Sequence, residues 1–232
     1  MFRCICLFLF ICSVCCGEDL LIKFDNDIYR VGNTHLFGEK HHSENSGKLF
    51  VSSERDIYLE QIGKNKIGDH KITDVSDLKF SSEIIIDGDR SRICGFDQHY
   101  IYIEKNVMYG DSGKIVYNDR NEPAALVTGF RLTENGRKNI AVRLDNIKRT
   151  EFVQIAPEVL YNEWKIFRTV KEREYFFVEE LKKCASRTEA EKFLSFNTVP
   201  VRQYKNWKSV FLQRAVEESE QKVNMIYKRF AK

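Results

Sequence analysis

The sequence predicts an all-β domain followed by an α-helical C-terminal region. Two observations support this prediction. From Asp19 to about Arg149, short runs of β-branched and aromatic residues alternate with glycine, asparagine and aspartate, a pattern typical of strands and turns. After Pro157 glycine is absent and apolar residues recur at spacings of three and four, which is typical of amphipathic helices. With 43% hydrophobic residues among 232, the chain can bury a core, which argues against global disorder.

Residues 1–17 precede the β domain and are typical of a signal peptide. Arg3 supplies a positive start, and the run 4–16 is almost wholly apolar. A membrane anchor needs about 20 apolar residues, and this run is shorter, so we expect cleavage near Gly17. The mature chain is then expected to be secreted, or held in the lumen of the secretory pathway, without a membrane span.

The cysteine count depends on that cleavage. Five of the seven cysteines lie within residues 1–17, which leaves Cys94 and Cys184. In an oxidising compartment these two form one disulfide or stay as two free thiols, and the sequence leaves both alternatives open. No spacing of ligand residues matches a metal site, so we expect neither a metal nor a cofactor.

The charge balance indicates no polyanionic partner. The net charge is +3, from 37 basic and 34 acidic residues, and the basic residues form no block or stripe. Nucleic-acid-binding proteins usually carry such a block. We therefore expect no nucleic-acid partner.

The β domain contains many short predicted strands at close spacing. In chain order they are 20–24, 28–31, 48–51, 56–59, 84–86, 100–103, 115–117, 124–127 and 140–144. Asp87-Gly88-Asp89 is typical of a hairpin turn, and residues 25–27 make a similar polar break after the first strand. Such a series of short strands favours a sandwich or a barrel.

The helical region contains three predicted helices. They cover 158–184, 188–196 and 203–230, with breaks at 186–189 and at 198–200. The predicted organisation is therefore a signal peptide over 1–17, a β domain over 18–152 and a helical region over 153–232, with the helices packed on or beside the β domain.

The tetrapeptide Gly110-Asp111-Ser112-Gly113 is the first candidate for chemistry. An ordinary turn between two strands is the simpler interpretation of Asp-Ser-Gly. A nucleophilic serine, however, needs a tight turn that lifts its hydroxyl out of a sheet, and adjacent glycines leave backbone amides open to bind an oxyanion. Ser112 is therefore a candidate nucleophile, with the amides of Gly110 and Ser112 as the oxyanion hole.

A serine nucleophile needs a histidine to take its proton and a carboxylate to orient that histidine. Asp56 stands at the start of an apolar strand, and His35 follows the strand 28–31. The other candidates are the histidines His41, His42 and His70 and the aspartates Asp74, Asp87 and Asp89. We favour His35 and Asp56 because they precede Ser112 in the order histidine, aspartate, serine, which the family named next also has.

These motifs resemble those of chymotrypsin-fold serine proteases of the trypsin-like superfamily, and most of all the alphavirus capsid protease. The similar segments are His35-Leu36-Phe37-Gly38, Lys48 to Asp56 with its Ser52-Ser53 pair, Gly110-Asp111-Ser112-Gly113, the polar hairpin Asn118 to Asn121, and Ala125 to Gly129. The match extends from Ile28 to Leu144 and is strongest between Gly110 and Gly129. The helical region has no counterpart in that family.

The resemblance implies a double β-barrel with a short N-terminal barrel, and a secreted serine endopeptidase that acts through an acyl-enzyme. In that mechanism Ser112 attacks the peptide carbonyl, His35 carries the proton and Asp56 orients His35. It also implies that Val127, Thr128 and Gly129 form an edge strand that pairs with the backbone of a protein or peptide substrate, and that no cofactor takes part.

Several features depart from the trypsin-like pattern. Lys114-Ile115 replaces the usual Gly-Pro, and the activating Ile-Val-Gly-Gly sequence is absent, so activation by a freed N-terminus is not expected. Trypsin carries an aspartate six residues before its nucleophile to bind Arg or Lys, whereas this chain has the neutral Asn106 there. The basic RNA-binding arm of the viral family is also missing, so neither RNA binding nor capsid assembly is expected.

Two other functions are compatible with the same sequence. One is a catalytically inactive protease-like scaffold that binds a protein partner through its helical region. The other is a secreted interaction protein in which Ser112 lies in an ordinary hairpin. The geometry of His35, Asp56 and Ser112 discriminates between them and the protease.

Overall fold

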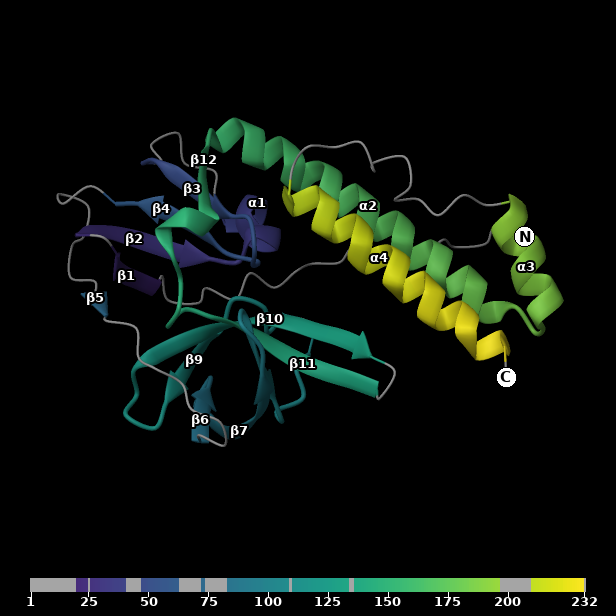
Figure 1. Ribbon diagram of the computed structural model, residues 1–232, viewed down its shortest axis with the longest axis horizontal. Coiled ribbons are helices and arrows are strands. Elements are labelled where there is room, and N and C mark those ends of the chain that lie inside the picture. The colour runs from purple at the N-terminus through teal and green to yellow at the C-terminus, as the bar shows by residue number, and fades with distance from the viewer. Residues whose placement is uncertain are drawn as a thin grey trace, which may run out of the picture.

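The computed structural model describes residues 20–24, 26–40, 47–62, 72–73, 83–108, 110–133, 136–196 and 210–231. They form an open β-sheet, a closed β-barrel and a helical region that extends to one side (Figure 1). The order of strands followed by helices is the one that the sequence predicts. The expected signal peptide 1–17 and the alternative candidates His41, His42, His70 and Asp74 lie outside the described residues.

The open sheet contains six strands in the order β12-β3-β4-β2-β1-β5. The strands are β1 (Leu20–Phe24), β2 (Asp27–Gly32), β3 (Leu49–Ser52), β4 (Tyr58–Gln61), β5 (Ile72–Thr73) and β12 (Phe152–Ile155). All neighbours are antiparallel except β1 and β5. Among the described strands this sheet is open, with β12 and β5 at opposite edges, so the closure expected of a short N-terminal barrel stays a prediction.

The closed barrel contains six antiparallel strands in the order β10-β11-β8-β7-β6-β9. They are β6 (Glu83–Ile86), β7 (Asp89–Phe96), β8 (Tyr100–Ile103), β9 (Ile115–Asn118), β10 (Pro123–Thr133) and β11 (Gly136–Arg143). Its interior is a cluster of isoleucine, valine and alanine side chains that includes Ile84, Ile101 and Val116. Asp87 has φ of 56° and Gly88 of 78° at the β6–β7 turn, as the predicted hairpin requires.

The sheet and the barrel share one hydrophobic core. Leu20, Ile22 and Leu59 from the sheet lie in the same buried cluster as Leu126 and Val142 from the barrel. β12 also follows the barrel in the chain, yet it pairs with β3 of the sheet. The last strand before the helices therefore completes the first sheet, and it extends to Ile155.

The helical region consists of α2 (Pro157–Lys183), α3 (Arg187–Phe196) and α4 (Val210–Lys228), followed by η5 (Arg229–Ala231). α2 begins with proline, whose fixed φ suits a first helical turn, and ends with two lysines at its negative pole. α2 and α4 lie side by side and extend away from the sheet (Figure 1). Val170, Val178, Leu181, Val223 and Ile226 form their buried contact.

The start of α2 anchors this region to the sheet. Leu160 is fully buried in a cluster with Phe37, Leu49 and Tyr58. Phe37 lies in α1 (Phe37–Lys40), which follows η1 (Thr34–Leu36) directly after β2. The helical region therefore packs against the segment that carries His35, as the expectation of helices packed beside the β domain requires.

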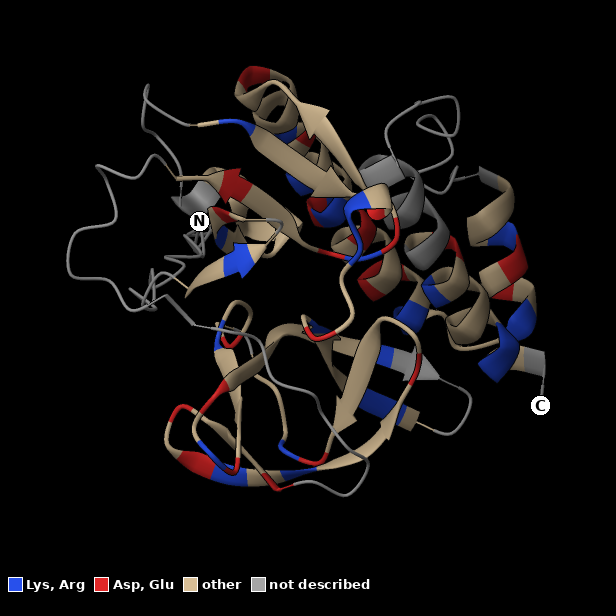
Figure 2. Ribbon diagram, turned by 60° about the vertical axis from the view of Figure 1, so that its left-hand side comes forward, with Lys and Arg blue, Asp and Glu red and all other residues tan. Residues whose placement is uncertain are grey.

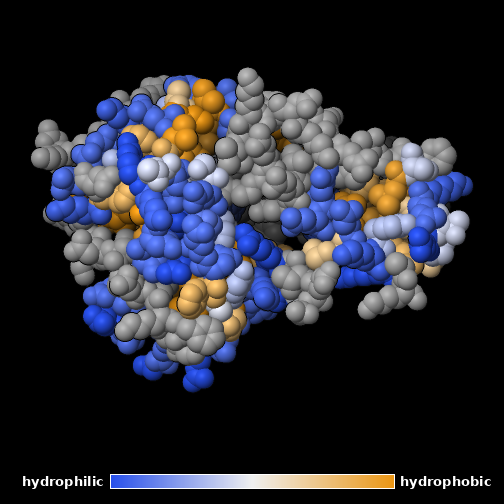
Figure 3. All heavy atoms as spheres, viewed as in Figure 1, coloured by the Kyte–Doolittle hydropathy of each residue, from blue (hydrophilic) through white to orange (hydrophobic). Residues whose placement is uncertain are grey.

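Positively and negatively charged residues are interspersed on the surface of the described part of the chain. Lys and Arg alternate with Asp and Glu over the barrel, the sheet and the helices (Figure 2). Hydrophilic residues dominate the face shown in Figure 3, with hydrophobic atoms exposed above the sheet and at the far end of the helical region.

No described helix is both long and apolar enough to cross a membrane. Cys94 and Cys184 are free thiols.

Candidate active site

His35 and Asp56 are in direct contact. His35 lies in η1 at the end of β2, and Asp56 lies in the loop between β3 and β4. His35 Nδ1 is 2.5 Å from one carboxylate oxygen of Asp56, and the His35 backbone amide donates to the other oxygen at 3.1 Å. Asp56 is only 8% exposed. This two-point contact orients the ring and leaves Nε2 as the nitrogen that can accept a proton.

Two glycines beside His35 are required by close packing. A Cβ at Gly32 would lie 2.6 Å from the ring of Tyr58, and a Cβ at Gly38 would lie 2.2 Å from the ring of Trp164. Such distances are well inside van der Waals contact, so neither position can carry a side chain without displacing a buried ring. The indole N–H of Trp164 also donates to the His35 carbonyl at 3.1 Å. The helical region therefore holds the backbone of the candidate base.

Ser112 lies in the tight loop that leads into β9. Gly110 has φ of 93° and Gly113 of 87°, and this left-handed conformation favours glycine. Nothing lies within 4 Å of a Cβ placed on Gly110, so backbone conformation rather than space demands glycine there. The Gly113 amide donates to the Val127 carbonyl at 2.8 Å, which holds the loop against β10.

The Ser112 hydroxyl donates to the carbonyl of Thr128 at 3.0 Å. The Ser112 hydroxyl therefore bonds to β10 and not to His35, which differs from the expected contact. Catalytic hydrogen bonds are often long or misaligned before substrate binds, and Ser112 stays a candidate nucleophile.

Asn33 connects the two halves of the candidate site. Its side-chain amide donates to the Asp56 carbonyl and to the Thr128 hydroxyl, both at 3.2 Å. Asn33 is 1% exposed, so both bonds are shielded from water. No pattern in the sequence indicates this role, because the two acceptors lie far from Asn33 along the chain. The result is a contiguous network that runs from Asp56 through Asn33 and Thr128 to Ser112.

The candidate oxyanion donors are available. Within the described part of the chain, no acceptor takes the backbone amides of Gly110 and Ser112. The amides of Asp111 and Gly113 are occupied by the carbonyls of Met108 and Val127. Backbone amides without an internal acceptor can stabilise a developing oxyanion.

The loop is held on its other side by a lysine. Lys114 Nζ lies 2.9 Å from Asp111 and 2.7 Å from Asp87 in the β6–β7 turn. Hydrogen bonds to Asp111 and Asp87 raise the pKa of Lys114. Burial raises the pKa of Asp111, but the bonds from Lys114 and from the Met108 amide outweigh burial and lower the pKa overall. All three groups therefore stay charged near neutral pH.

β10 has an open side next to Ser112. It pairs with β9 only as far as Leu126, and Val127 then bonds with the nucleophile loop. A register shift separates Val127 from Gly129, whose φ is 141°. From Thr128 onward, one side of β10 has no partner strand among the described residues, whereas the amide and carbonyl of Val127 both bond with the nucleophile loop. The substrate-binding edge over Val127, Thr128 and Gly129 stays a prediction.

Two of the alternative aspartates lie away from His35. Asp87 and Asp89 flank the β6–β7 turn, where they pair with Lys114 and Lys105. Besides Asn33, sequence reasoning also missed Trp164 and the role of Lys114. A lysine after Gly-Asp-Ser-Gly was visible as a departure from the trypsin-like pattern, whereas Trp164 looked like any other residue of an amphipathic helix.

Comparisons with known proteins give structural likenesses only. No family model and no curated protein sequence matches the chain. The proteases of tobacco vein mottling virus and of tobacco etch virus are similar in structure, with TM-scores of 0.38 and 0.35, at 13% and 12% identity. Both overlaps cover 54% of this chain, and 73% and 71% of the respective viral chains. Because both TM-scores are low, the case for a protease rests on the side chains of His35, Asp56 and Ser112.

Proposed function

We propose that this protein is a secreted serine endopeptidase with a chymotrypsin-like arrangement of its sheet and barrel. The observation that carries the proposal is the two-point contact of His35 with Asp56. Asn33 connects this contact to the strand on which Ser112 rests. The apolar run within residues 1–17 supports secretion.

The proposed reaction starts when the Ser112 side chain rotates from Thr128 toward His35. The hydroxyl oxygen attacks the carbonyl carbon of the substrate peptide while its proton passes to Nε2 of His35, and Asp56 stabilises the imidazolium. The oxyanion of the tetrahedral intermediate accepts hydrogen bonds from the amides of Gly110 and Ser112. His35 then protonates the leaving amine, the C–N bond breaks, and an acyl-enzyme on Ser112 remains.

The second half-reaction repeats these roles with water. His35 takes a proton from the water, whose oxygen attacks the acyl carbon, and the proton returns to Ser112 when the ester bond breaks. The substrate backbone pairs with the open side of β10 at Thr128 and Gly129. No metal or cofactor enters any step.

Labelling with a fluorophosphonate tests the proposal. We expect the purified protein to gain one adduct at Ser112 by intact-mass and peptide analysis, and expect Ser112→Ala and His35→Ala to gain none. Ser186→Ala is the matched control, because its hydroxyl caps the start of α3 away from the site, and it should label like the wild type. A folded wild-type protein that resists the probe would overturn the proposal.

Resistance to the probe would favour a second candidate function, a protease-like scaffold that binds a protein partner without catalysis. The observation in its favour is the bond from the Ser112 hydroxyl to Thr128, which directs the proton away from His35. In this second candidate the serine stays fixed, and the helical region is the surface that binds the protein partner.

A further inference from the structure

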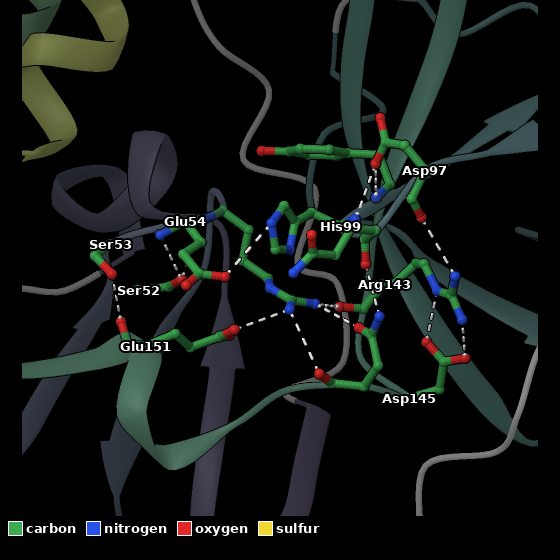
Figure 4. A network of polar contacts seen from close by, with 12 residues as sticks. Ser52, Ser53, Glu54, Asp97, His99, Arg143, Asp145 and Glu151 are labelled. Carbon is green, nitrogen blue, oxygen red and sulfur yellow. Dashed lines mark hydrogen bonds and ion pairs between the residues drawn. The ribbon is translucent and has the colours of Figure 1, made fainter.

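A second cluster of side chains, which offer possible metal ligands, lies where the sheet meets the barrel (Figure 4). Glu54 comes from the β3–β4 loop, Glu151 from η3 (Arg149–Glu151) just before β12, and His99 from the β7–β8 turn. One ligand atom from each residue lies within 4.8 Å of the others, and His99 Nε2 is 3.4 Å from a Glu54 oxygen. None of these residues has a part in the proposed protease reaction.

Glu151 is the residue in this cluster that most needs a ligand. Its side chain is 2% exposed, and Oε2 pairs with the Arg55 guanidinium at 2.9 Å. Oε1 is buried and has no hydrogen-bond partner among the described residues. A buried carboxylate oxygen without a partner is costly, and a cation bound beside it would remove that cost. Because Arg55 takes the other oxygen, it orients the carboxylate from outside such a site, as outer partners of metal ligands do.

The three backbones that carry these side chains are held in place. The Ser53 amide and hydroxyl both donate to the Glu151 carbonyl, at 2.7 and 3.1 Å. The Glu54 amide donates to the Ser52 hydroxyl at 3.1 Å, and the His99 amide donates to Asp97 at 2.9 Å. The cluster is therefore presented by fixed segments, with side-chain rotation as the remaining adjustment.

Charge also favours a cation. Glu54 and Glu151 contribute two negative charges, and Arg55 contributes one positive charge, so the ionised cluster keeps a net negative charge. One imidazole with two carboxylates suits a zinc-like divalent transition metal. Calcium and magnesium prefer oxygen ligands alone. Ligand atoms around zinc lie about 3 to 4 Å apart, and the half-exposed Glu54 side chain can swing inward to close the remaining gap.

We propose that Glu54, His99 and Glu151 bind a divalent transition metal of the zinc type, with water completing the coordination. The ion joins two segments of the sheet to one turn of the barrel. It thereby fixes the β3–β4 loop, in which Asp56 follows Glu54 and Arg55. The site is structural in this proposal and holds whether or not Ser112 is catalytic.

Metal titration of the purified, EDTA-treated protein tests this site. We expect calorimetry with ZnCl₂ to show one tight site per chain, and expect zinc in excess of its dissociation constant to raise the unfolding temperature by about 4 °C or more. CoCl₂ should give visible d–d absorption. Calcium at the same concentration should leave the unfolding temperature unchanged.

Three variants distinguish zinc binding at this site from zinc binding by the thiols and the other histidines of the chain. Glu54→Gln and His99→Gln should weaken zinc binding by at least about tenfold and remove the zinc-dependent rise in unfolding temperature. Glu54 is half exposed, so its variant should still fold. Glu83→Gln is the matched control, because it removes an exposed carboxylate that, within the described part of the chain, pairs only with Arg90. Absence of zinc binding in the wild type, unchanged binding in His99→Gln, or equal stabilisation by calcium would each overturn the proposal.

Discussion

At the residue scale, the orientation of His35 depends on one carboxylate. Asp56 accepts hydrogen bonds from both the ring and the backbone amide of the same histidine. A neutral amide in its place would donate to Nδ1 and stabilise the tautomer that carries its proton on Nε2. That tautomer cannot accept the serine proton.

Asp56→Asn is therefore expected to lower kcat of peptide hydrolysis by about 10⁴-fold, the size of the effect of the equivalent change in a known triad. The structure around the site should remain, because the side chain keeps its shape. Burst kinetics with an ester substrate would measure the loss, and circular dichroism would check the fold. A loss of less than about tenfold would show that Asp56 does not orient the base.

Lys114 is expected to position the nucleophile loop. Its ammonium joins Asp111 to the β6–β7 turn, so Lys114→Met should free the loop and slow fluorophosphonate labelling by about 10- to 100-fold. Lys105→Met is the matched control, because Lys105 pairs with Asp89 at the other end of the same turn. Equal labelling rates in the two variants would contradict the positioning role.

The surroundings of Asn106 argue against a cationic residue before the scissile bond. The Arg137 guanidinium donates to the carbonyl of Val107, the next residue, and also lies over the Phe130 ring. A buried Arg or Lys of the substrate would meet this positive charge, and the neutral Asn106 offers it no charge to pair with, at a cost of several kcal/mol. Profiling with a peptide library should show a preference for apolar or aromatic residues, and dominant cleavage after Arg or Lys would refute it.

At the element scale, helix α2 contacts two different parts of the molecule. Near its start, Trp164 bonds to His35, and Leu160 packs in a buried cluster with Leu49 and Tyr58 of the sheet. Near its middle, Glu174 is 3% exposed and bonds to Lys171, Lys222 and Ser219. The first contact holds the base, and the second holds α4.

The Glu174 network predicts acid sensitivity of the α2–α4 pair. Burial raises the pKa of Glu174, but Lys171, Lys222 and Ser219 outweigh burial and lower the pKa below its usual 4.5. Because the pKa is lower in the folded state, the stabilisation is present at neutral pH and is lost as pH falls below 4.5 through the folded-state value.

Glu174→Gln should accordingly reduce the free energy of unfolding by about 1–3 kcal/mol at pH 7. The difference between variant and wild type should shrink as pH falls from 5 to 3. Thermal unfolding followed by far-ultraviolet circular dichroism at each pH would measure it. A constant difference across this range would contradict the assignment.

At the scale of the whole molecule, the sheet and the barrel are expected to unfold together because they share a core. Leu126 of β10 is 2% exposed in the cluster that also contains Leu59 of β4. Leu126→Ala should cost about 2–4 kcal/mol, and denaturant midpoints measured by labelling activity and by circular dichroism of the β-strands should shift equally. Val153→Ala, at a side chain 61% exposed, is the control and should cost less than about 0.5 kcal/mol. Two separate transitions would show that the shared core does not couple the sheet and the barrel.

The sequence by itself determined the division into strands and helices, because the periodicity of apolar residues is a local property. It also identified His35, Asp56 and Ser112, whose neighbours along the chain form short motifs. The structure places the first two of these in contact. Ser112 rests against Thr128 instead, and no local pattern encodes that rotamer.

Only the tertiary structure decided how distant segments meet. Asn33 bonds to Thr128, Trp164 bonds to His35, and β12 returns to pair with β3. The tertiary structure also decided that the first sheet is open and that Glu54, His99 and Glu151 lie close together. Each depends on where separate elements pack, and packing is set by the shared core rather than by the residues next to each group in the sequence.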